Sequence, residues 1–599
     1  MSLRRRGNPS MPSSNSPSQK PADAEPPTTS DETKPLTKPK TNKRETYSPG
    51  RRYIGRSRIQ TVIFGIGIGI VVALSQRSRS SDCLPESWAL CTKGRNSAIY
   101  TVDPTNPTVE CVVVNQKSIV SWGTKEYVKK TWGDRDTVGP PLLGNSDAQK
   151  SWALGEEVAK KGLKFKYLKD GEAAFPGFAD AHAHILDYGA SRELNLVGSS
   201  SVEEVRDRIK NYILSKPEIL NDTTIWIQTS GWDQNRFPGG TYPFAADLEA
   251  DELLRGRPIV LARVDYHAYW ISPRALELLG DLPDQVDGGL IVRDADGRPT
   301  GIFVDNAMAL VDKTKPTWTR LEMLSYYNTT IHDALKHGLT SIHDAATYPL
   351  WIDFFKFVAD RGGLPIRLNL MAHIDSDDYW GGRLEKLEGY ADHRLNNVHC
   401  IGDRANHIVL DAFEKALSED TQKLRHRLEH AQILTQDDIK RVGQLGIIAS
   451  VQPTHCTSDM SYAETRLGPE RIKGAYAWQS LIRNGAHFAT GSDFPVEGIN
   501  PLLGFYAAVT RLDENGESPH GPGGWFPDER LTREQALYGM TLGAAYAGHQ
   551  EDIIGSLTPG KRADLVVLDK DIMQVPPAEI LKTKVKVTIV DGNVFYGKL

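Results

Sequence analysis

Short apolar runs alternate with helical patterns through the middle of this 599-residue chain. The apolar runs lie at residues 225–230, 259–264, 340–343, 366–372, 398–401, 447–451 and 487–490. Two of the helices have clear start signals: Thr435 is a predicted N-cap for a helix that ends at Gly446, and Thr532 forms a capping box with Gln535. Strand–helix alternation of this length favours parallel βα units, most simply a (β/α)8-type TIM barrel over residues 176–549.

Alternating segments near both ends of the chain indicate a second domain. The candidate strands are residues 98–102, 110–114, 118–122, 563–568 and 586–590, and Asp591-Gly592 follows the last with a hairpin-type turn signal. Two strand-rich pieces that flank a long α/β stretch predict one composite β-sandwich domain, built from residues 95–175 and 550–599.

Composition limits what the body of the protein can bind. Residues 1–60 hold 13 Lys/Arg against 5 Asp/Glu, so the remainder carries a net charge of −13 out of a total of −5. An acidic body argues against a nucleic-acid-binding surface. Five cysteines exclude a disulfide-built scaffold. Cys83 and Cys91 fit either a local disulfide or two unpaired buried thiols.

The N-terminal segment has the composition of a disordered tail followed by a membrane anchor. Residues 1–58 are basic and rich in Pro and Ser. Residues 59–75 contain the uncharged run Ile59–Leu74, which as a helix is about 24 Å long against a hydrocarbon core of about 30 Å. A secretory apolar region and a buried core helix are the alternatives.

More arginines precede this run than follow it, which predicts a cytosolic N-terminus and a lumenal or extracellular body. In that orientation Asn221-Asp-Thr223 and Asn328-Thr-Thr330 are candidate glycan acceptors. The expected partners are therefore a lipid bilayer, contacted through one helix, and a small-molecule substrate.

Histidines at strand ends are the strongest chemical signal. In the segment PGFADAHAH, at residues 176–184, His182 and His184 are two positions apart, so on a strand they face the same side and can ligate one metal ion. A lone pair of this kind is weak evidence. His399, His430 and Asp493 each lie in or just after a later apolar run. In a barrel all five converge at the C-terminal rim of the strands, as a hydrolytic metal centre requires.

The sequence resembles the amidohydrolase superfamily, specifically the amidohydrolase-3 branch that includes N-substituted formamide deformylase-like enzymes. The resemblance covers roughly residues 95–599. It is carried by residues 176–184, 287–301, 338–344, 399–406, 425–431, 450–455, 491–496 and 555–564. It implies a (β/α)8 barrel with a composite β-domain and metal-dependent hydrolysis of amide or other C–N bonds.

The resemblance also assigns roles to the candidate residues. His182, His184, His399 and His430 become metal ligands, with His426 as the rival to His430. Asp493 becomes both a ligand and the catalytic acid–base group. Imidazole-rich ligation favours zinc. Glu429 is either a hydrogen-bond partner of this site or a solvated charge.

Substrate contacts are predicted less specifically. Trp232 and His267 follow predicted strands, and His455 lies in the stretch SVQPTH, so all three are candidates for lining the pocket. A packed tryptophan and a hydrogen-bonded core histidine are the alternative interpretations. Asp344 is likewise either a pocket residue or a structural residue of the core.

One departure from the family pattern concerns the metal count. Relatives have a strand that ends in a lysine able to bridge two metals, but here only 22 residues separate Ile374 from Asn397. This interval is too short to hold a further strand and helix. We therefore expect a barrel that lacks one βα unit, through a real deletion or, the favoured interpretation, an incomplete gene model, with one metal ion rather than two.

The sequence thus predicts a membrane-anchored, metal-dependent amidohydrolase that hydrolyses a C–N bond of a small molecule. Two alternatives remain. The first is a catalytically degenerate scaffold or binding protein that retains the fold. The second is a metal-dependent deaminase or C–O hydrolase, because activated water attacks other electrophiles too.

Overall fold

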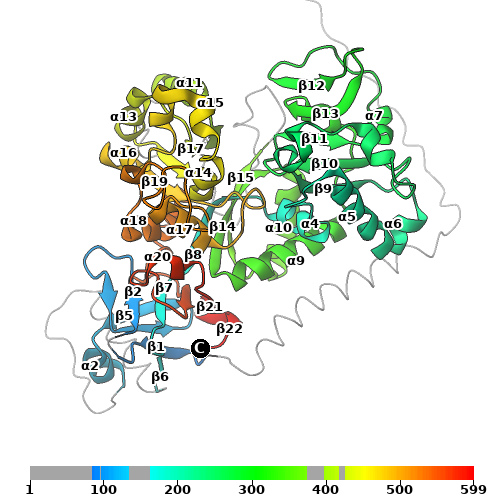
Figure 1. Ribbon diagram of the computed structural model, residues 1–599. Helices are drawn as coiled ribbons and strands as arrows, with labels where there is room; N and C mark the ends of the chain where they lie inside the picture. The colour runs from blue at the N-terminus through cyan, green and yellow to red at the C-terminus, as the bar shows by residue number, and fades with distance from the viewer. Residues whose placement is uncertain (1–83, 95, 134–161, 374–396, 417–424) are drawn as a thin grey trace, which may run out of the picture. The chain divides into compact units, whose positions relative to one another are not determined.

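The computed structural model describes residues 84–94, 96–133, 162–373, 397–416 and 425–599 (Figure 1). By its contacts the chain divides into Met1–Thr61 and Val62–Leu599, and every described residue belongs to the second unit. The predicted tail (1–58) and anchor (59–75) lie outside the described residues. Within the described part of the chain, no helix has the length and apolar character needed to cross a membrane.

Two parallel sheets form a TIM-barrel-like core, which confirms the predicted α/β class. One sheet has the order β15-β14-β8, with β8 at Phe178–Ala183, β14 at Leu339–Thr347 and β15 at Arg367–Ala372. The other has the order β16-β17-β18-β19, with β16 at Asn397–Cys400, β17 at Arg427–His430, β18 at Ile448–Val451 and β19 at His487–Thr490.

The two sheets meet where β19 ends beside β8. The backbone N–H of Asp493 donates to the carbonyl oxygen of His182 at 2.8 Å. A Cβ on Gly491 would lie 2.5 Å from the backbone nitrogen of His182, so only glycine allows this approach. In the described residues no strand pairs with the outer edges of β15 and β16. Residues 374–396 between them are not described, so the missing βα unit stays a prediction.

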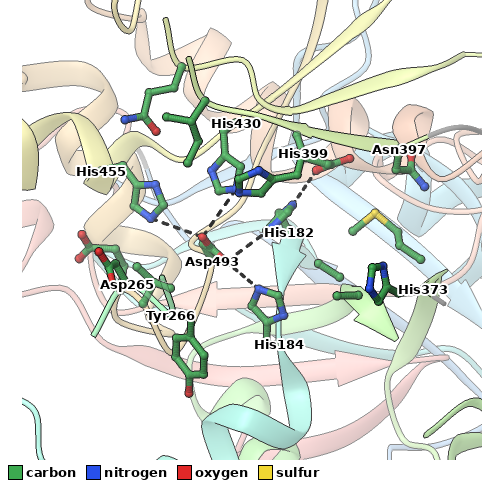
Figure 2. A pocket seen from close by; sticks show the side chains of 18 of the residues that line it. His182, His184, Asp265, Tyr266, His373, Asn397, His399, His430, His455 and Asp493 are labelled. Carbon is green, nitrogen blue, oxygen red and sulfur yellow. Dashed lines mark hydrogen bonds and ion pairs between the residues drawn. The ribbon is translucent and has the colours of Figure 1, made fainter. Parts of the chain in front are cut away.

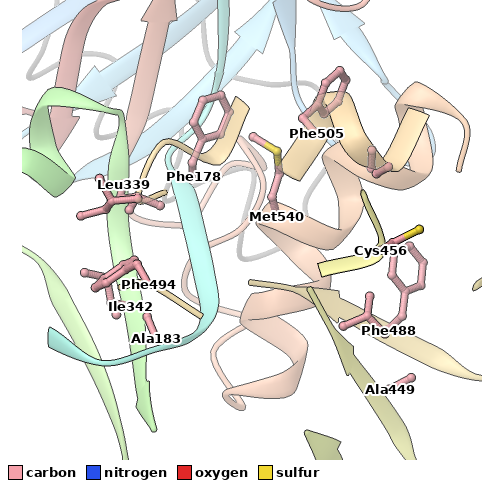
Figure 3. Close-up of a cluster of buried hydrophobic side chains, with 14 of the residues drawn as sticks. Phe178, Ala183, Leu339, Ile342, Ala449, Cys456, Phe488, Phe494, Phe505 and Met540 are labelled. Carbon is pink, nitrogen blue, oxygen red and sulfur yellow. The ribbon is translucent and has the colours of Figure 1, made fainter. Parts of the chain in front are cut away.

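Helices follow the barrel strands in sequence. They are α4 (Ile185–Glu193), α9 (Arg320–Lys336), α10 (Pro349–Asp360), α11 (Asp403–Ala416), α13 (Gln436–Gln444), α14 (Pro453–Asp459), α15 (Ala463–Arg471), α16 (Trp478–Arg483), α17 (Pro501–Thr510), α18 (Arg533–Tyr538) and α19 (Ala544–Ala547). Thr435 and Thr532 cap α13 and α18, and Thr532 and Gln535 form a capping box, as predicted. Apolar side chains such as Phe178, Ile342 and Met540 form the core between strands and helices (Figure 3).

Two of the predicted barrel strands belong to another sheet. β9 (Ile227–Trp232) and β10 (Ile259–Arg263) pair in parallel, but they belong to a five-stranded sheet of order β12-β13-β11-β10-β9. The other strands are β11 (Ala268–Ile271), β12 (Gly289–Arg293) and β13 (Pro299–Asp305), and the accompanying helices are α5 (Val202–Ser215), α6 (Pro217–Asn221), α7 (Pro273–Leu279) and α8 (Met308–Asp312). This sheet is an insertion between β8 and β14. The assignment of these two runs to the barrel was wrong because a parallel pair has the same apolar signature in either sheet.

The chain ends form the predicted β-sandwich. One sheet has the order β5-β4-β1-β6, with β1 at Ser87–Cys91, β4 at Cys111–Asn115, β5 at Ser118–Gly123 and β6 at Lys164–Tyr167. The other has the order β22-β21-β20-β7-β2-β3, with β2 at Ala98–Tyr100, β3 at Thr108–Val109, β7 at Ala173–Pro176, β20 at Leu565–Leu568, β21 at Val585–Val590 and β22 at Asn593–Gly597. Trp88, Val112 and Val567 are among the buried side chains of its core. The short helices α2 (Lys125–Val128) and α20 (Pro577–Ile580) complete the described elements.

Cys91 forms a disulfide with Cys111, so the pairing of Cys91 with Cys83 was wrong. Cys91 and Cys111 are direct partners in the antiparallel β1–β4 ladder, with Cα atoms 4.1 Å apart. Facing residues of an antiparallel pair lie only about 4.5–5.5 Å apart, so the ladder brings the two cysteines within reach of a disulfide. Strand order, which local sequence does not reveal, therefore decides the pairing.

We expect the Cys111→Ser variant to lose about 3 kcal/mol of unfolding free energy, because the disulfide closes a loop with a sequence separation of 20 residues. Urea unfolding with and without reductant measures this loss. Cys83→Ser is the matched control and should leave stability unchanged. Peptide mapping without reduction that found Cys83 linked to Cys91 would contradict the assignment.

Candidate metal centre

Asp493 lies at the centre of a group of histidines contributed by three parts of the barrel (Figure 2). Its Oδ1 is 3.0 Å from Nε2 of His184 and 3.5 Å from Nε2 of His182, at the end of β8. Its Oδ2 is 4.0 Å from Nε2 of His430, which ends β17, and 3.7 Å from Nε2 of His455, on α14. The predicted convergence of His182, His184, His430 and Asp493 is therefore present in the structure, and their roles as ligands stay predictions.

A tighter group within this cluster has the geometry of a metal site. Among the described residues, His182, His430 and Asp493 offer ligand atoms that all lie within 4.8 Å of one another, and all three residues are buried. His399, on β16, lies beside this group rather than in it: its ring centroid is 4.5 Å from that of His430. His426, the rival to His430, is not in the group and stacks on Phe413.

The donor set fits a divalent cation. Nδ1 of His430 and Nε2 of His455 are buried and have no hydrogen-bond partner among the described residues. Buried nitrogens normally have partners, and the unpaired Nε2 of His455 lies 3.7 Å from Oδ2 of Asp493, as expected where a cation would bind. Burial also lowers the pKa of His430, and it lowers that of His399 to about 4, which keeps both imidazoles in the neutral, metal-binding form.

Two consecutive residues of β17, Glu429 and His430, both face this centre. Neighbouring side chains on a strand normally point to opposite faces. Here His430 adopts a left-handed backbone conformation, with φ of 74°, which redirects its side chain at the strand end. Asp493 has the same kind of conformation, with φ of 61°. Non-glycine residues in this region cost on the order of 1–3 kcal/mol and cluster at functional sites.

Glu429 is a hydrogen-bond partner of the site, not a solvated charge. Its Oε2 is 2.7 Å from Nδ1 of His182, and both side chains are almost fully buried. Burial alone would raise the pKa of Glu429, but the Arg427 guanidinium and the contact with His182 outweigh it and hold the pKa at about 2. The carboxylate therefore stays ionised behind the histidine.

Asp180 has a structural role at this site that its sequence position did not reveal. Its carboxylate accepts hydrogen bonds from the backbone N–H groups of His182 and Ser492 at 3.1 and 3.0 Å, and from the Ser492 hydroxyl at 2.6 Å. It thereby holds the loop that carries Asp493 against β8. Burial raises the pKa of Asp180 to about 6. Asp180 lies two positions before His182 and therefore on the same face of the strand. That spacing is the only sign of its role in the sequence motif.

Asp344 is likewise structural. Its Oδ1 accepts the backbone N–H of Ile185 at 2.8 Å, and its Oδ2 accepts the Thr347 hydroxyl at 2.7 Å. The first contact fixes the start of α4, directly after His184.

A cavity of about 2290 Å³ opens onto the cluster, and the three predicted substrate residues differ in their relation to it. His455 and His267 line it, and Nδ1 of His267 is 2.9 Å from Asp305. Trp232 does not line it. That side chain is fully buried, its Nε1 donates to the carbonyl oxygen of Leu261 at 2.8 Å, and it packs on Trp270. The pocket prediction for Trp232 is corrected to the packed alternative.

Tyr266 is a cavity residue that sequence reasoning missed. Its ring stacks over that of His184 at a centroid distance of 6.4 Å, and its hydroxyl donates to Ser230 at 2.6 Å. Only its position directly before His267 hinted at this placement.

The comparisons with known proteins agree with this architecture. Residues 170–397 and 395–596 match the sequence profile of the amidohydrolase family Amidohydro_3. Putative amidohydrolase YtcJ of Bacillus subtilis (strain 168) is 29% identical over 561 residues, covering 84% of this chain and 98% of that protein. N-substituted formamide deformylase of Arthrobacter pascens is 24% identical over 579 residues, with the same coverage of 84% and 98%.

Two further similarities extend the comparison. Protein LONG AFTER FAR-RED 3 of Arabidopsis thaliana is 30% identical over 468 residues, covering 67% of this chain and 78% of that protein. The crystal structure of an uncharacterized metal-dependent hydrolase from Pyrococcus horikoshii OT3 superposes with a TM-score of 0.59 at 24% identity, covering 82% of this chain and 99% of that one, which supports the fold. The chain belongs to the amidohydrolase family.

We expect Asp180→Asn to lower the free energy of unfolding by about 1–3 kcal/mol. The carboxylate accepts hydrogen bonds from the N–H and the hydroxyl of Ser492, and the N–H₂ group of an amide would face these donors without being able to accept from them. The free energy of unfolding in urea measures this. Asp207→Asn, at an exposed position on α5, is the control. Equal stability of the Asp180→Asn variant and the wild type would show that the carboxylate does not hold the Asp493 loop.

Proposed function

We propose that this protein is a metal-dependent hydrolase that cleaves the C–N bond of a small amide. The observation that carries the proposal is Asp493, a buried carboxylate surrounded by the imidazoles of His182, His184, His430 and His455 at the bottom of a cavity. Family membership and the names of two relatives, a putative amidohydrolase and an N-substituted formamide deformylase, support the reaction class.

The chain's own residues divide the work in this proposal. His182, His430 and Asp493 hold one divalent cation, zinc by donor type, with His184 and His399 adjacent. A cation there supplies a lowered pKa for water and polarises the substrate carbonyl. Asp493 accepts a proton from the attacking water and returns it to the leaving amine. His184 contacts one oxygen of the Asp493 carboxylate at 3.0 Å and thereby orients it.

His455 and His267 are the proposed substrate contacts. Nε2 of His455 is buried without a hydrogen-bond partner in the described part of the chain and lies 3.7 Å from Asp493, so its N–H can donate to a substrate carbonyl beside the reacting group. His267 lies in the turn between β10 and β11 of the inserted sheet and lines the cavity. Its ring centroid is 5.8 Å from that of His399 on β16.

We expect the purified protein to contain about one equivalent of a divalent metal, and chelation followed by added Zn²⁺ to abolish and then restore hydrolysis of small formamides or amides. Asp493→Asn should lower turnover by about 10²–10⁴-fold, because it removes the proton acceptor. Metal analysis and an amide-hydrolysis screen measure these outcomes, with Asp207→Asn as the control. Metal-free, folded protein with no turnover would refute the hydrolase.

That negative result would favour a second candidate, a non-catalytic member that retains the fold. A specific observation supports it: in the part of the barrel that the structure describes, no strand ends in a lysine able to bridge two metals.

We also propose that residues 59–75 anchor the protein in a membrane, with the body on the lumenal or extracellular side. The uncharged run and the preceding arginines support this. The Cys91–Cys111 disulfide supports the lumenal or extracellular side for the body, because such bonds persist in oxidising compartments.

In this orientation the exposed Asn221 at the end of α6, within its Asn-Asp-Thr sequon, should carry a glycan. Expression with microsomes should then give a mobility shift that endoglycosidase removes and that Asn221→Gln diminishes. A body that protease digests in intact microsomes, with no shift, would place it on the cytosolic side.

A further inference from the structure

A buried pair of charged side chains lies directly behind His182. Nδ1 of His182 is 2.7 Å from Oε2 of Glu429, while Nε2 of the same ring faces Asp493 at 3.5 Å. The side chains of His182 and Glu429 are only 5% and 4% exposed, so water does not compete for this contact. The two ring nitrogens of His182 therefore face two different carboxylates.

Arg427 fixes which atoms of Glu429 accept hydrogen bonds. Its Nε is 2.7 Å from Oε1, and its Nη2 donates to Oε2 at 3.0 Å. The first contact is an ion pair without a hydrogen bond, and in the second the guanidinium can only donate, so Oε2 of the carboxylate accepts. The group that faces Oε2 from the other side, Nδ1 of His182, must then be a donor.

Further hydrogen bonds hold the guanidinium in place, with the two N–H groups of Nη2 shared among three acceptors. Nη2 also donates to the carbonyl oxygen of Ala181 at 2.7 Å and to the hydroxyl of Ser450 at 3.0 Å, and Nη1 donates to Nδ1 of His343 at 2.9 Å. The Ala181 contact is notable because that residue immediately precedes His182. The same arginine thus holds both the strand that carries the histidine and the carboxylate that orients it.

A neutral imidazole carries one N–H. If that proton is on Nδ1, then Nε2 has the free lone pair that a metal requires. Carboxylates that accept the far N–H of a histidine ligand in this way orient the ring and strengthen it as a ligand.

We propose that Glu429, held by Arg427, is a positioning residue that fixes His182 in the Nδ1–H tautomer and presents Nε2 to a divalent cation beside Asp493. The proposal rests on the metal site of the proposed function. The alternative is that Glu429 serves only as the counter-ion of a buried arginine.

Glu429→Gln separates the two roles. With the amide oxygen of the introduced side chain beside Nε of Arg427, in the place of Oε1, the amide N–H₂ group takes the place of Oε2, loses the contact with Nη2 and donates to Nδ1 of His182. The ring proton then moves to Nε2, the atom needed for the metal. A pure counter-ion role predicts a stability change without this tautomer reversal.

The first measurement is the affinity for Zn²⁺ alone, by competition with a chromogenic chelator. We expect Glu429→Gln to bind about 10–100-fold more weakly than the wild type. Glu551→Gln is the matched control, because it removes the carboxylate of another partly buried pair, Arg425–Glu551, outside the cluster around Asp493, and should bind as the wild type does. Equal affinity of the Glu429→Gln variant and the wild type would overturn the proposal.

The second measurement reads the tautomer in the wild-type protein and uses a variant only to assign signals. Histidine ¹⁵N chemical shifts of the metal-free wild type report the tautomer of His182, whose signals are assigned by their loss in His182→Asn. An Nδ1–H tautomer supports the proposal and an Nε2–H tautomer overturns it. Wild-type protein with no Zn²⁺ affinity would instead refute the metal site itself, while the tautomer would still decide the role of Glu429.

Discussion

The Arg427 guanidinium links the two sheets of the barrel through its buried interior. It contacts Ala181 on β8 and His343 on β14, in one sheet, and Glu429 on β17 and Ser450 on β18, in the other. The residue is fully buried, and a buried charge is tolerated only when it is paired and hydrogen-bonded. The barrel interior therefore depends on Glu429, and the same carboxylate sets the position of His182. The Arg427–Glu429 ion pair thus contributes to the stability of the fold and to the geometry of the site.

The sequence predicted the members of the site better than their geometry. The two-residue spacing of His182 and His184 is a property of any strand, so their common face followed directly. His430 was identified by the family motif, but strand alternation alone would turn it away if Glu429 faces the centre. Only the left-handed backbone of His430 brings both inward, and no local pattern predicts that. Trp232 shows the reverse error, since a position after a strand does not distinguish a pocket wall from a packed core.

Within the fold, caps and apolar runs were predictable, and sheet membership was not. Thr435 and Thr532 start helices because capping is local chemistry. The assignment of β9 and β10 to a sheet depends on contacts with β11 and β13, which lie later in the chain. The missing βα unit, inferred from the short interval before Asn397, stays a prediction, because residues 374–396 are not described. The two stretches that match the family profile meet at residues 395–397, at the end of this interval in the sequence.

The sandwich imposes an order on folding during synthesis. β7, which leads into the strand with His182, pairs with β20, and residues 177–564 separate the two strands in the chain. At roughly 5–20 residues per second a ribosome needs on the order of 20–80 s to make that stretch. Throughout this interval the early strands have no C-terminal partners and expose apolar edges. The sandwich is therefore completed only when the last strands of the chain emerge.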